Sequence, residues 1–170
     1  MSTLKVDTIT GKTTAGTVAM PAGHVIQVVQ GEVLTQVSNS SNSFSDLVTQ
    51  AITPKFSSSS IYISCTGCGT PEANNAIFFR ILRDSTEIGS GSGGSNNNVI
   101  GALTNPNSGG TNGFDIKGWA FQFLDAPSTT NSITYKLQSS ANNGTAKIGG
   151  RQDNTDIAVP SRITLMEIKQ

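Results

Sequence analysis

The chain has 170 residues, in which 11 Lys and Arg balance 11 Asp and Glu, and charged residues make up only 13%. This length suffices for one domain whose core buries about two thirds of the unfolded surface. The low, balanced charge argues against a nucleic-acid-binding protein, which needs a basic stripe, and against a cationic membrane-surface helix.

No stretch approaches the roughly 20 apolar residues that a membrane-spanning helix needs. The first residues also lack the basic region and apolar region of a secretion signal. We therefore expect a protein that is made in a cytosol and does not insert into membranes. Only Cys65 and Cys68 are available for disulfides, which excludes the multi-bridged framework of a small secreted module.

Residues 1–23 differ from the rest of the chain. They contain two short alternating runs with too few apolar residues for a core of their own, and Pro21 and Gly23 break the pattern before the main body. We expect an arm that docks on a partner or intertwines with its copies. Its predicted contact residues are Leu4, Val6, Ile9, Val18 and Met20.

From His24 onwards the apolar residues recur with a period of two, which predicts β-strands. In residues 116–124, Trp119, Phe121 and Phe123 share one face, as in a strand with one buried side. The run 76–82 is apolar on both faces and predicts a central strand. Further strands are expected around residues 25–29, 61–63, 133–137 and 163–166.

Turn-forming residues separate these strands at 38–43, 89–98, 105–113 and 141–144. The pair Asn143-Gly144 is typical of a hairpin turn, because both residues accept a positive φ. Eight or nine short strands between His24 and Lys169 predict an all-β sandwich or jelly roll over residues 24–170.

The CxxC motif at Cys65 and Cys68 follows a predicted strand and is not followed by a helix, so two structural cysteines are favoured over a redox pair. A zinc site would need a second cysteine pair, and the single histidine, His24, is remote. His24 itself is interpreted as a strand-edge residue. The alternative is one of three imidazoles that meet on the axis of a trimer.

The sequence contains no complete motif for catalysis. The Gly/Ser-rich run that starts at Gly89 lacks the ending of a phosphate-binding loop, and a Ser-His-Asp triad would have to use His24. The carboxylates that a glycosidase would need are scattered over predicted loops, and the two at Asp153 and Asp156 do not make an EF-hand. We expect no catalytic residue, no cofactor and no metal site; the carboxylates considered are Asp84, Glu87, Asp115, Asp125, Asp153 and Asp156.

Residues 1–11 (MSTLKVDTITG) and 17–28 (TVAMPAGHVIQV) resemble the start of structural proteins from marine bacteriophages, especially cyanophages. Residues 79–89, 119–138 and 161–168 are similar to the tip domains of phage tail fibres and head fibres. The resemblance implies a jelly-roll head of the C1q and tumour-necrosis-factor type, assembled as a homotrimer in the virion. A trimer needs a second apolar surface, and the candidates are Phe79, Trp119, Phe121 and Phe123.

The leading hypothesis is therefore a short trimeric fibre or spike, which attaches to a tail or capsid socket by residues 1–23 and touches a host glycan or protein with its loops. The predicted host-contact residues are Ser95, Asn97, Asn107, Asn112, Asn143 and Asp153. A capsid decoration or cement protein is the alternative. A depolymerase acting on surface polysaccharide is a third hypothesis, disfavoured because paired carboxylates are missing from the pattern.

Overall fold

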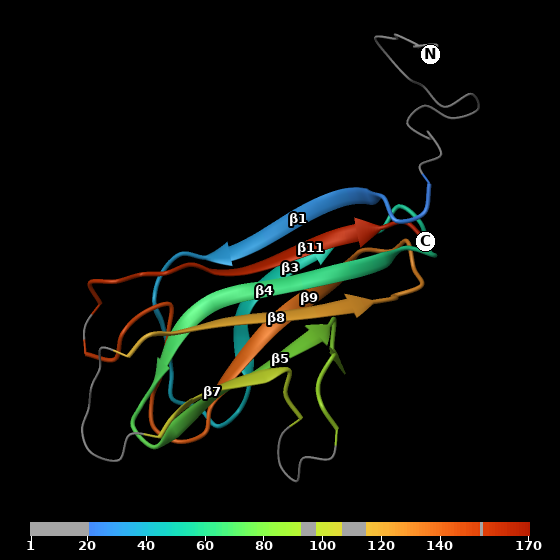
Figure 1. Ribbon diagram of the computed structural model, residues 1–170. Helices are drawn as coiled ribbons and strands as arrows, with labels where there is room; N and C mark the ends of the chain where they lie inside the picture. The colour runs from blue at the N-terminus through green and yellow to red at the C-terminus, as the bar shows by residue number, and fades with distance from the viewer. Residues whose placement is uncertain (1–20, 93–97, 107–114, 154) are drawn as a thin grey trace.

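The computed structural model describes residues 21–92, 98–106, 115–153 and 155–170. These residues form strands and connections without any helix, so no helix among them could cross a membrane. Figure 1 shows the arrangement. The strands are β1 (Val25–Val33), β2 (Val37–Asn39), β3 (Ser45–Ile52), β4 (Ser60–Pro71), β5 (Asn75–Arg83), β6 (Thr86–Ile88), β7 (Gly101–Asn105), β8 (Lys117–Asp125), β9 (Ile133–Ala141), β10 (Ala146–Ile148) and β11 (Ser161–Ile168).

The strands form two sheets. Sheet A has the order β1-β11-β4-β10-β2, with β8 on the other edge of β4, and sheet B has the order β3-β9-β5-β6, with β7 also on β5. The four long antiparallel pairs are nested in the sequence: β5 pairs with β7, β4 with β8, β3 with β9 and β1 with β11. A long hairpin rolled into two sheets in this way is a jelly roll. The predicted all-β sandwich is confirmed, with three three-residue strands added to the eight longer ones.

The core lies between the sheets because alternate residues of each long strand point inward. On β4 the side chains of Ile61, Ile63 and Cys65 are fully buried, whereas Tyr62 and Ser64 between them are only partly buried. The core cluster comprises Leu47, Val48, Ile52, Ile61, Ile63, Cys65, Ile77, Phe79, Ile81, Leu103, Trp119, Ile133, Tyr135, Leu137, Ala141, Ala146, Ile148, Ile163 and Leu165.

A buried carboxylate fixes the connection between β3 and β4. Glu167 on β11 is 0% exposed. Its Oε1 accepts hydrogen bonds from the backbone N–H groups of Lys55 (2.8 Å) and Phe56 (3.2 Å). Its Oε2 accepts from Nε2 of Gln27 at 2.7 Å. A buried charge is tolerated when such donors replace water, so this side chain holds the loop onto the end of sheet A.

A second polar cluster joins the sheets at the same end. Asp125 closes β8 in sheet A, and its carboxylate accepts hydrogen bonds from Nη1 of Arg83 (2.9 and 3.0 Å) and from the hydroxyl of Tyr135 (2.6 Å) in sheet B. Burial and the neighbouring Asp125 raise the pKa of Tyr135, so this phenol remains a hydrogen-bond donor.

The turn at Asn143-Gly144 corrects a prediction. Gly144 has the expected positive φ of 65°. However, the strands that it joins are not paired with one another: β9 lies in sheet B and β10 in sheet A. The turn is therefore a crossing between sheets and not a hairpin, because local turn chemistry specifies a φ value and not the partner of the next strand.

We expect Glu167→Ala to lower the free energy of unfolding by about 2 to 4 kcal/mol, because two backbone N–H groups and the Gln27 amide lose their acceptor. Urea denaturation would measure this cost. The matched control is Glu32→Ala, whose exposed carboxylate pairs with Arg162 at 3.1 Å and should cost about 0.5 kcal/mol or less. Equal losses of unfolding free energy in the two variants would contradict the role of Glu167 in holding the β3–β4 connection.

Candidate functional site

Both ends of the described chain lie at one end of the sandwich (Figure 1). The backbone N–H of Gly23 donates to the carbonyl of Lys169 at 2.7 Å, and the N–H of Lys169 donates to the carbonyl of His24 at 3.0 Å. His24 is exposed just before β1, with its Nδ1 3.1 Å from the carbonyl of Pro21. The predicted arm residues Leu4, Val6, Ile9, Val18 and Met20 lie outside the described residues.

Strand β4 connects this end to the far end. Its first residue, Ser60, pairs with Ile168 beside the C-terminus, and its last, Pro71, pairs with Ala146 after the 142–145 turn. Twelve residues at about 3.3 Å each span roughly 36 Å when extended. The 142–145 turn thus lies a strand length away from the termini.

Side chains brace the turn at the far end. Oε2 of Glu72 accepts a hydrogen bond from the backbone N–H of Thr145 at 2.8 Å. Oδ1 of Asn75 accepts from the backbone N–H of Asn143, also at 2.8 Å. Nε2 of Gln152 donates to the carbonyl of Thr145 at 2.7 Å. These side chains therefore fix the backbone of the turn, while the side chain of Asn143 is exposed.

Two of the predicted host-contact residues share this far end. Asn143 lies in the braced turn, and Asp153 lies in the β10–β11 connection, where it forms an ion pair with Arg151. The other four candidates, Ser95, Asn97, Asn107 and Asn112, lie outside the described residues.

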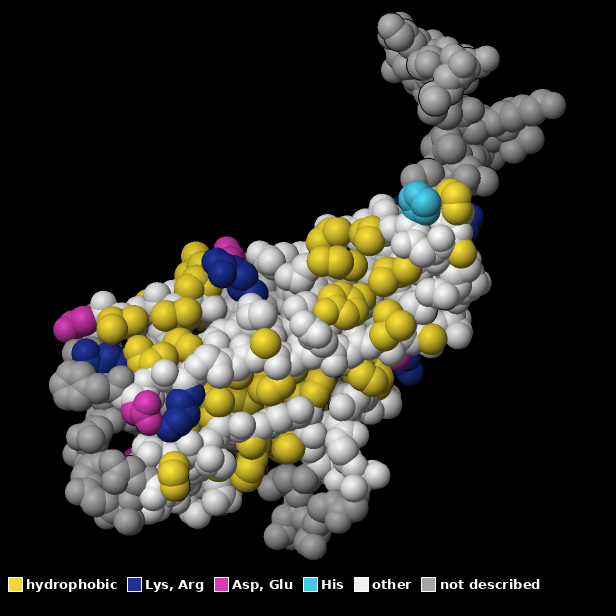
Figure 2. Space-filling view, in the orientation of Figure 1, with side chains coloured by type: hydrophobic (Ala, Val, Ile, Leu, Met, Phe, Trp, Pro, Cys, Tyr) yellow, Lys and Arg dark blue, Asp and Glu magenta, His cyan; other side chains and the backbone are white. Residues whose placement is uncertain are grey.

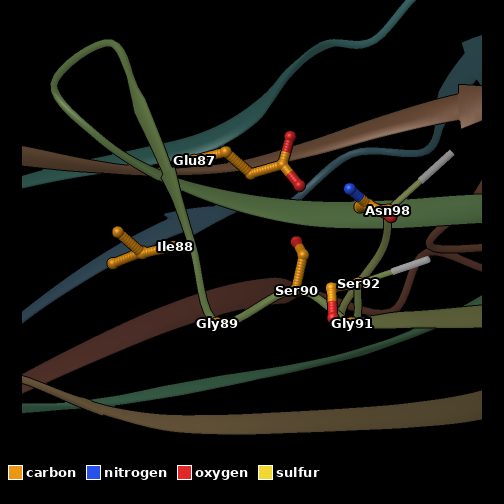
Figure 3. Close-up of a pocket in the computed structure, with 7 residues that line it drawn as sticks. All are labelled: Glu87, Ile88, Gly89, Ser90, Gly91, Ser92 and Asn98. Carbon is orange, nitrogen blue, oxygen red and sulfur yellow. The ribbon is translucent and has the colours of Figure 1, made fainter. Parts of the chain in front are cut away.

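An open pocket of about 390 Å³ lies beside the end of β6 (Figure 3). It is lined by Glu87, Ile88, Gly89, Ser90, Gly91, Ser92 and Asn98. Glu87 is the one carboxylate in this lining, and it lies 3.3 Å from Nη1 of Arg80. The hydroxyl of Ser90 is buried and has no hydrogen-bond partner among the described residues. A single, ion-paired carboxylate does not provide the two acids of glycoside hydrolysis.

The other carboxylates considered at the sequence level have separate structural partners. Asp125 bonds Arg83 and Tyr135, Asp115 pairs with Lys117 at 2.7 Å, and Asp84 accepts a hydrogen bond from the backbone N–H of Thr134. Within the described part of the chain, no three His, Cys, Asp or Glu side chains gather in a way that could hold a metal ion.

The four aromatic residues predicted for a trimer interface face the inside of one chain. Phe79 is 0% and Trp119 is 6% exposed, and Phe121 and Phe123 pack against the core cluster. The ring centroids of Phe79 lie 4.9 Å from Trp119 and 5.1 Å from Phe121. Alternation correctly placed the β8 aromatics on one face, but that face is covered by sheet B. The burial of Phe79 and Trp119 leaves them little surface for contact with another chain.

Each aromatic ring of β8 lies against a glycine. A Cβ atom added to Gly67 would collide with Trp119, and one added to Gly101 would collide with Phe121. A Cβ on Gly89 would lie 2.9 Å from the ring of Phe123. The three rings of β8 thus pack closely against the backbone of β4, of β7 and of the residue after β6, at positions where a side chain would not fit.

The two cysteines are free and buried on β4. Burial raises the pKa of Cys65 to about 12, and burial also raises the pKa of Cys68. Because the thiolate is the reactive form, both side chains are unreactive at neutral pH. This placement agrees with the prediction of structural cysteines.

No family model and no curated protein matches the chain. Among solved structures, the chain is similar to the T13 viral particle of IBDV, at 10% identity and a TM-score of 0.46, over 97% of this chain and 41% of that one. It is also similar to the VP2 subviral particle of infectious bursal disease virus, at 11% identity and a TM-score of 0.43, over 99% and 45% of the two chains. The chain thus spans less than half the length of either. The assignment of a jelly roll therefore rests on the strand order given above and not on these two similarities.

Gly101→Ala should lower the free energy of unfolding by about 1 to 3 kcal/mol, because the new methyl group overlaps the Phe121 ring. Gly118→Ala is the control, since a Cβ there would come no closer than 4.0 Å to the carbonyl of Gly67. Thermal and urea denaturation would compare them. The double variant Gly101→Ala/Phe121→Leu should recover part of the loss, and no recovery would contradict the steric explanation.

Cys65→Ala should destabilise the protein at neutral pH by about 1 to 2 kcal/mol, because it empties part of the core. At about pH 10.5 the wild type and Cys65→Ala should have nearly equal free energies of unfolding. The pKa of the thiol is 9.0 in the unfolded chain and about 12 in the folded one. The contribution of Cys65 to the free energy of unfolding is therefore complete below pH 9. It falls as the pH rises from 9 toward 12, by about 2 kcal/mol at pH 10.5. Ser64→Ala, on the same strand, should show no such change in denaturation measured at both pH values.

Proposed function

We propose that the chain is a structural protein of a bacteriophage virion, a short homotrimeric fibre or spike of C1q-like and tumour-necrosis-factor-like shape. In this proposal residues 1–23 attach it to a tail or capsid socket. The jelly-roll head of residues 24–170 meets the host surface. The role requires neither a catalytic residue nor a cofactor.

The observation that carries the proposal is the polarity of the head. The chain enters β1 beside its own C-terminal residues, as the hydrogen bonds between Gly23, His24 and Lys169 require. The 142–145 turn and the loop that contains Asp153 lie at the opposite end of β4. An anchor at one end and loops at the other is the geometry that an adhesive tip needs.

The chemistry of the far end suits contact with a polar host surface. Asn143 presents an amide, which both donates and accepts hydrogen bonds, from a turn whose backbone is held by Glu72 and Asn75. A preformed turn loses little entropy on binding. Several copies of a weak site on one trimer would multiply its affinity for a repetitive surface glycan or protein.

The location is tested by immunogold electron microscopy of intact virions, with antibodies raised against the full protein. Gold at a fibre or tail tip supports the proposal. Gold spread evenly over the shell would replace it with the decoration or cement role. Protein found in the lysate but never on purified virions would overturn both.

The adhesive role is tested by competition, in which the full protein is added in excess and virion adsorption to host cells is measured. Asn143→Trp at the far end should weaken this competition by about tenfold, because a bulky ring blocks a central contact. Asn131→Trp is the matched control, since Asn131 is also exposed but lies in the β8–β9 connection at the end of the termini. Equal effects of the two variants would contradict far-end binding.

A further inference from the structure

The outer face of sheet A carries a row of apolar side chains across four strands. The strand registers align Val28 on β1 with Met166 on β11, Met166 with Tyr62 on β4, and Tyr62 with Leu124 on β8. We call Val28, Met166, Tyr62 and Leu124 the apolar row. Its two end members are each 54% exposed.

The alternation of the strands accounts for the outward direction of this row. Leu165 and Glu167 on either side of Met166 are fully buried, as are Ile61 and Ile63 on either side of Tyr62. Since neighbours on a strand point to opposite faces, the row points away from the core. It covers no part of the sandwich to which it belongs.

The apolar surface continues toward the termini. Ile168, the outward-facing last residue of β11, pairs with Val25, which is 50% exposed. In Figure 2 hydrophobic side chains lie over β1, β11, β4 and β8 on the face in view. Contiguous exposed apolar surface of this kind marks a site of contact with another molecule.

Around β9 the outer face of sheet B has a different character. Its side chains form a polar network: Lys136 lies 3.1 Å from Asp46, Nε2 of Gln138 donates to Asp46, and Nε of Arg80 donates to Oε1 of Gln138 at 2.7 Å. The hydrogen bond from Gln138, together with Lys136, lowers the pKa of Asp46, so the carboxylate stays charged. Phe78 and Leu82 on β5 also face outward from sheet B, but Phe78 is partly buried and Leu82 is 8% exposed. The large apolar side chains on strands that are about half exposed, Val25, Val28 and Leu124, lie on sheet A.

The chemistry next to the apolar row fits a second copy of this chain. The following register row is Gln30, Thr164, Ser64 and Gln122, all uncharged. Amide and hydroxyl groups both donate and accept hydrogen bonds, so copies of this face can meet around a three-fold axis without the repulsion that like charges would cause. The charges beyond this row, Glu32 and Arg162, form an ion pair with each other at 3.1 Å.

The size of the face is also adequate. Four strands about 4.8 Å apart and about 25 Å long give a projected area of roughly 500 Å². The accessible surface of protruding side chains exceeds this projection. A standard stable interface buries about 800 Å² per partner and the smallest stable ones about 600 Å². Stable association therefore needs the whole outer face of sheet A with its protruding side chains, and not the apolar row alone.

We propose that the outer face of sheet A, centred on the apolar row, is the surface through which copies of this chain associate. The inference rests on the self-association included in the proposed function and gives that association a location, distinct from the aromatic residues that fill the core. Copies related by an axis along the strands would have Gly23 and Lys169 at one end and the 142–145 turns at the other.

The test is the molar mass of the full protein, measured by light scattering. The wild type should have a multiple of the chain mass. Val28→Lys/Leu124→Lys, which places two charges at the ends of the apolar row, should have the mass of one chain. The control Thr49→Lys/Ala102→Lys places the same charges at exposed positions of the two edge strands of sheet B and should keep the wild-type mass.

Each other outcome overturns a distinct statement. A wild type with the mass of one chain at all concentrations would overturn self-association itself, while the virion location would still be decided by microscopy. A multimer unchanged by Val28→Lys/Leu124→Lys would overturn the assignment to sheet A alone. Thermal unfolding would establish that the variants are folded.

A second measurement does not depend on charged substitutions. Ser64→Cys places a thiol at the centre of the face, while Thr49→Cys places one on the outer face of sheet B. In the assembled protein the first should react with a thiol reagent about tenfold more slowly, because the interface must open first. The buried native cysteines react little. Equal rates in the assembled protein would overturn the proposal.

Discussion

The alternation of side chains along β4 constrains most of this structure. The strand pairs with β11 and β10 on one edge and with β8 on the other, so its pleat sets the faces of three neighbours. Ile61, Ile63 and Cys65 enter the core, and Tyr62 and Ser64 point outward. A slip of one residue would reverse every one of these assignments. The core, the apolar row and the unreactive thiol at Cys65 thus have one geometric origin.

The outer faces of the two sheets differ in the side chains that they carry. Sheet B meets water with a network of paired charges around Asp46, Lys136 and Arg80. Sheet A presents an apolar row beside uncharged amides and hydroxyls. On sheet A the nearest charges to the apolar row, Glu32 and Arg162, are paired with each other.

Much of the fold could be predicted from the sequence, because period-two alternation is a local signal. The strands around Ile61, Trp119, Tyr135 and Leu165 were expected where they occur. What alternation cannot specify is the layer that covers a face. The same pattern that placed Trp119 and Phe121 together was compatible with an interface between chains, whereas the structure covers them with sheet B.

The candidate surfaces were harder to predict for the same reason. The apolar row consists of single residues from four strands, separated by 34 to 62 positions along the chain and joined only by register. No local motif marks it. Gly144 shows the complementary limit, since its positive φ was expected but the crossing between sheets was not. The predicted arm residues and four of the predicted loop residues lie outside the described part of the chain.

The position of the chain ends has a mechanical consequence. Because Gly23 and Lys169 lie side by side, tension applied between the two termini would peel β1 from β11 one hydrogen bond at a time. Tension applied between Pro21 and the 142–145 turn would instead run along the strands. The hydrogen bonds of an antiparallel ladder lie across that direction, so they would be loaded together in shear. The sandwich is therefore weakest when pulled by its two ends and strongest along its length, which in the proposed role is the direction of the load between anchor and host surface.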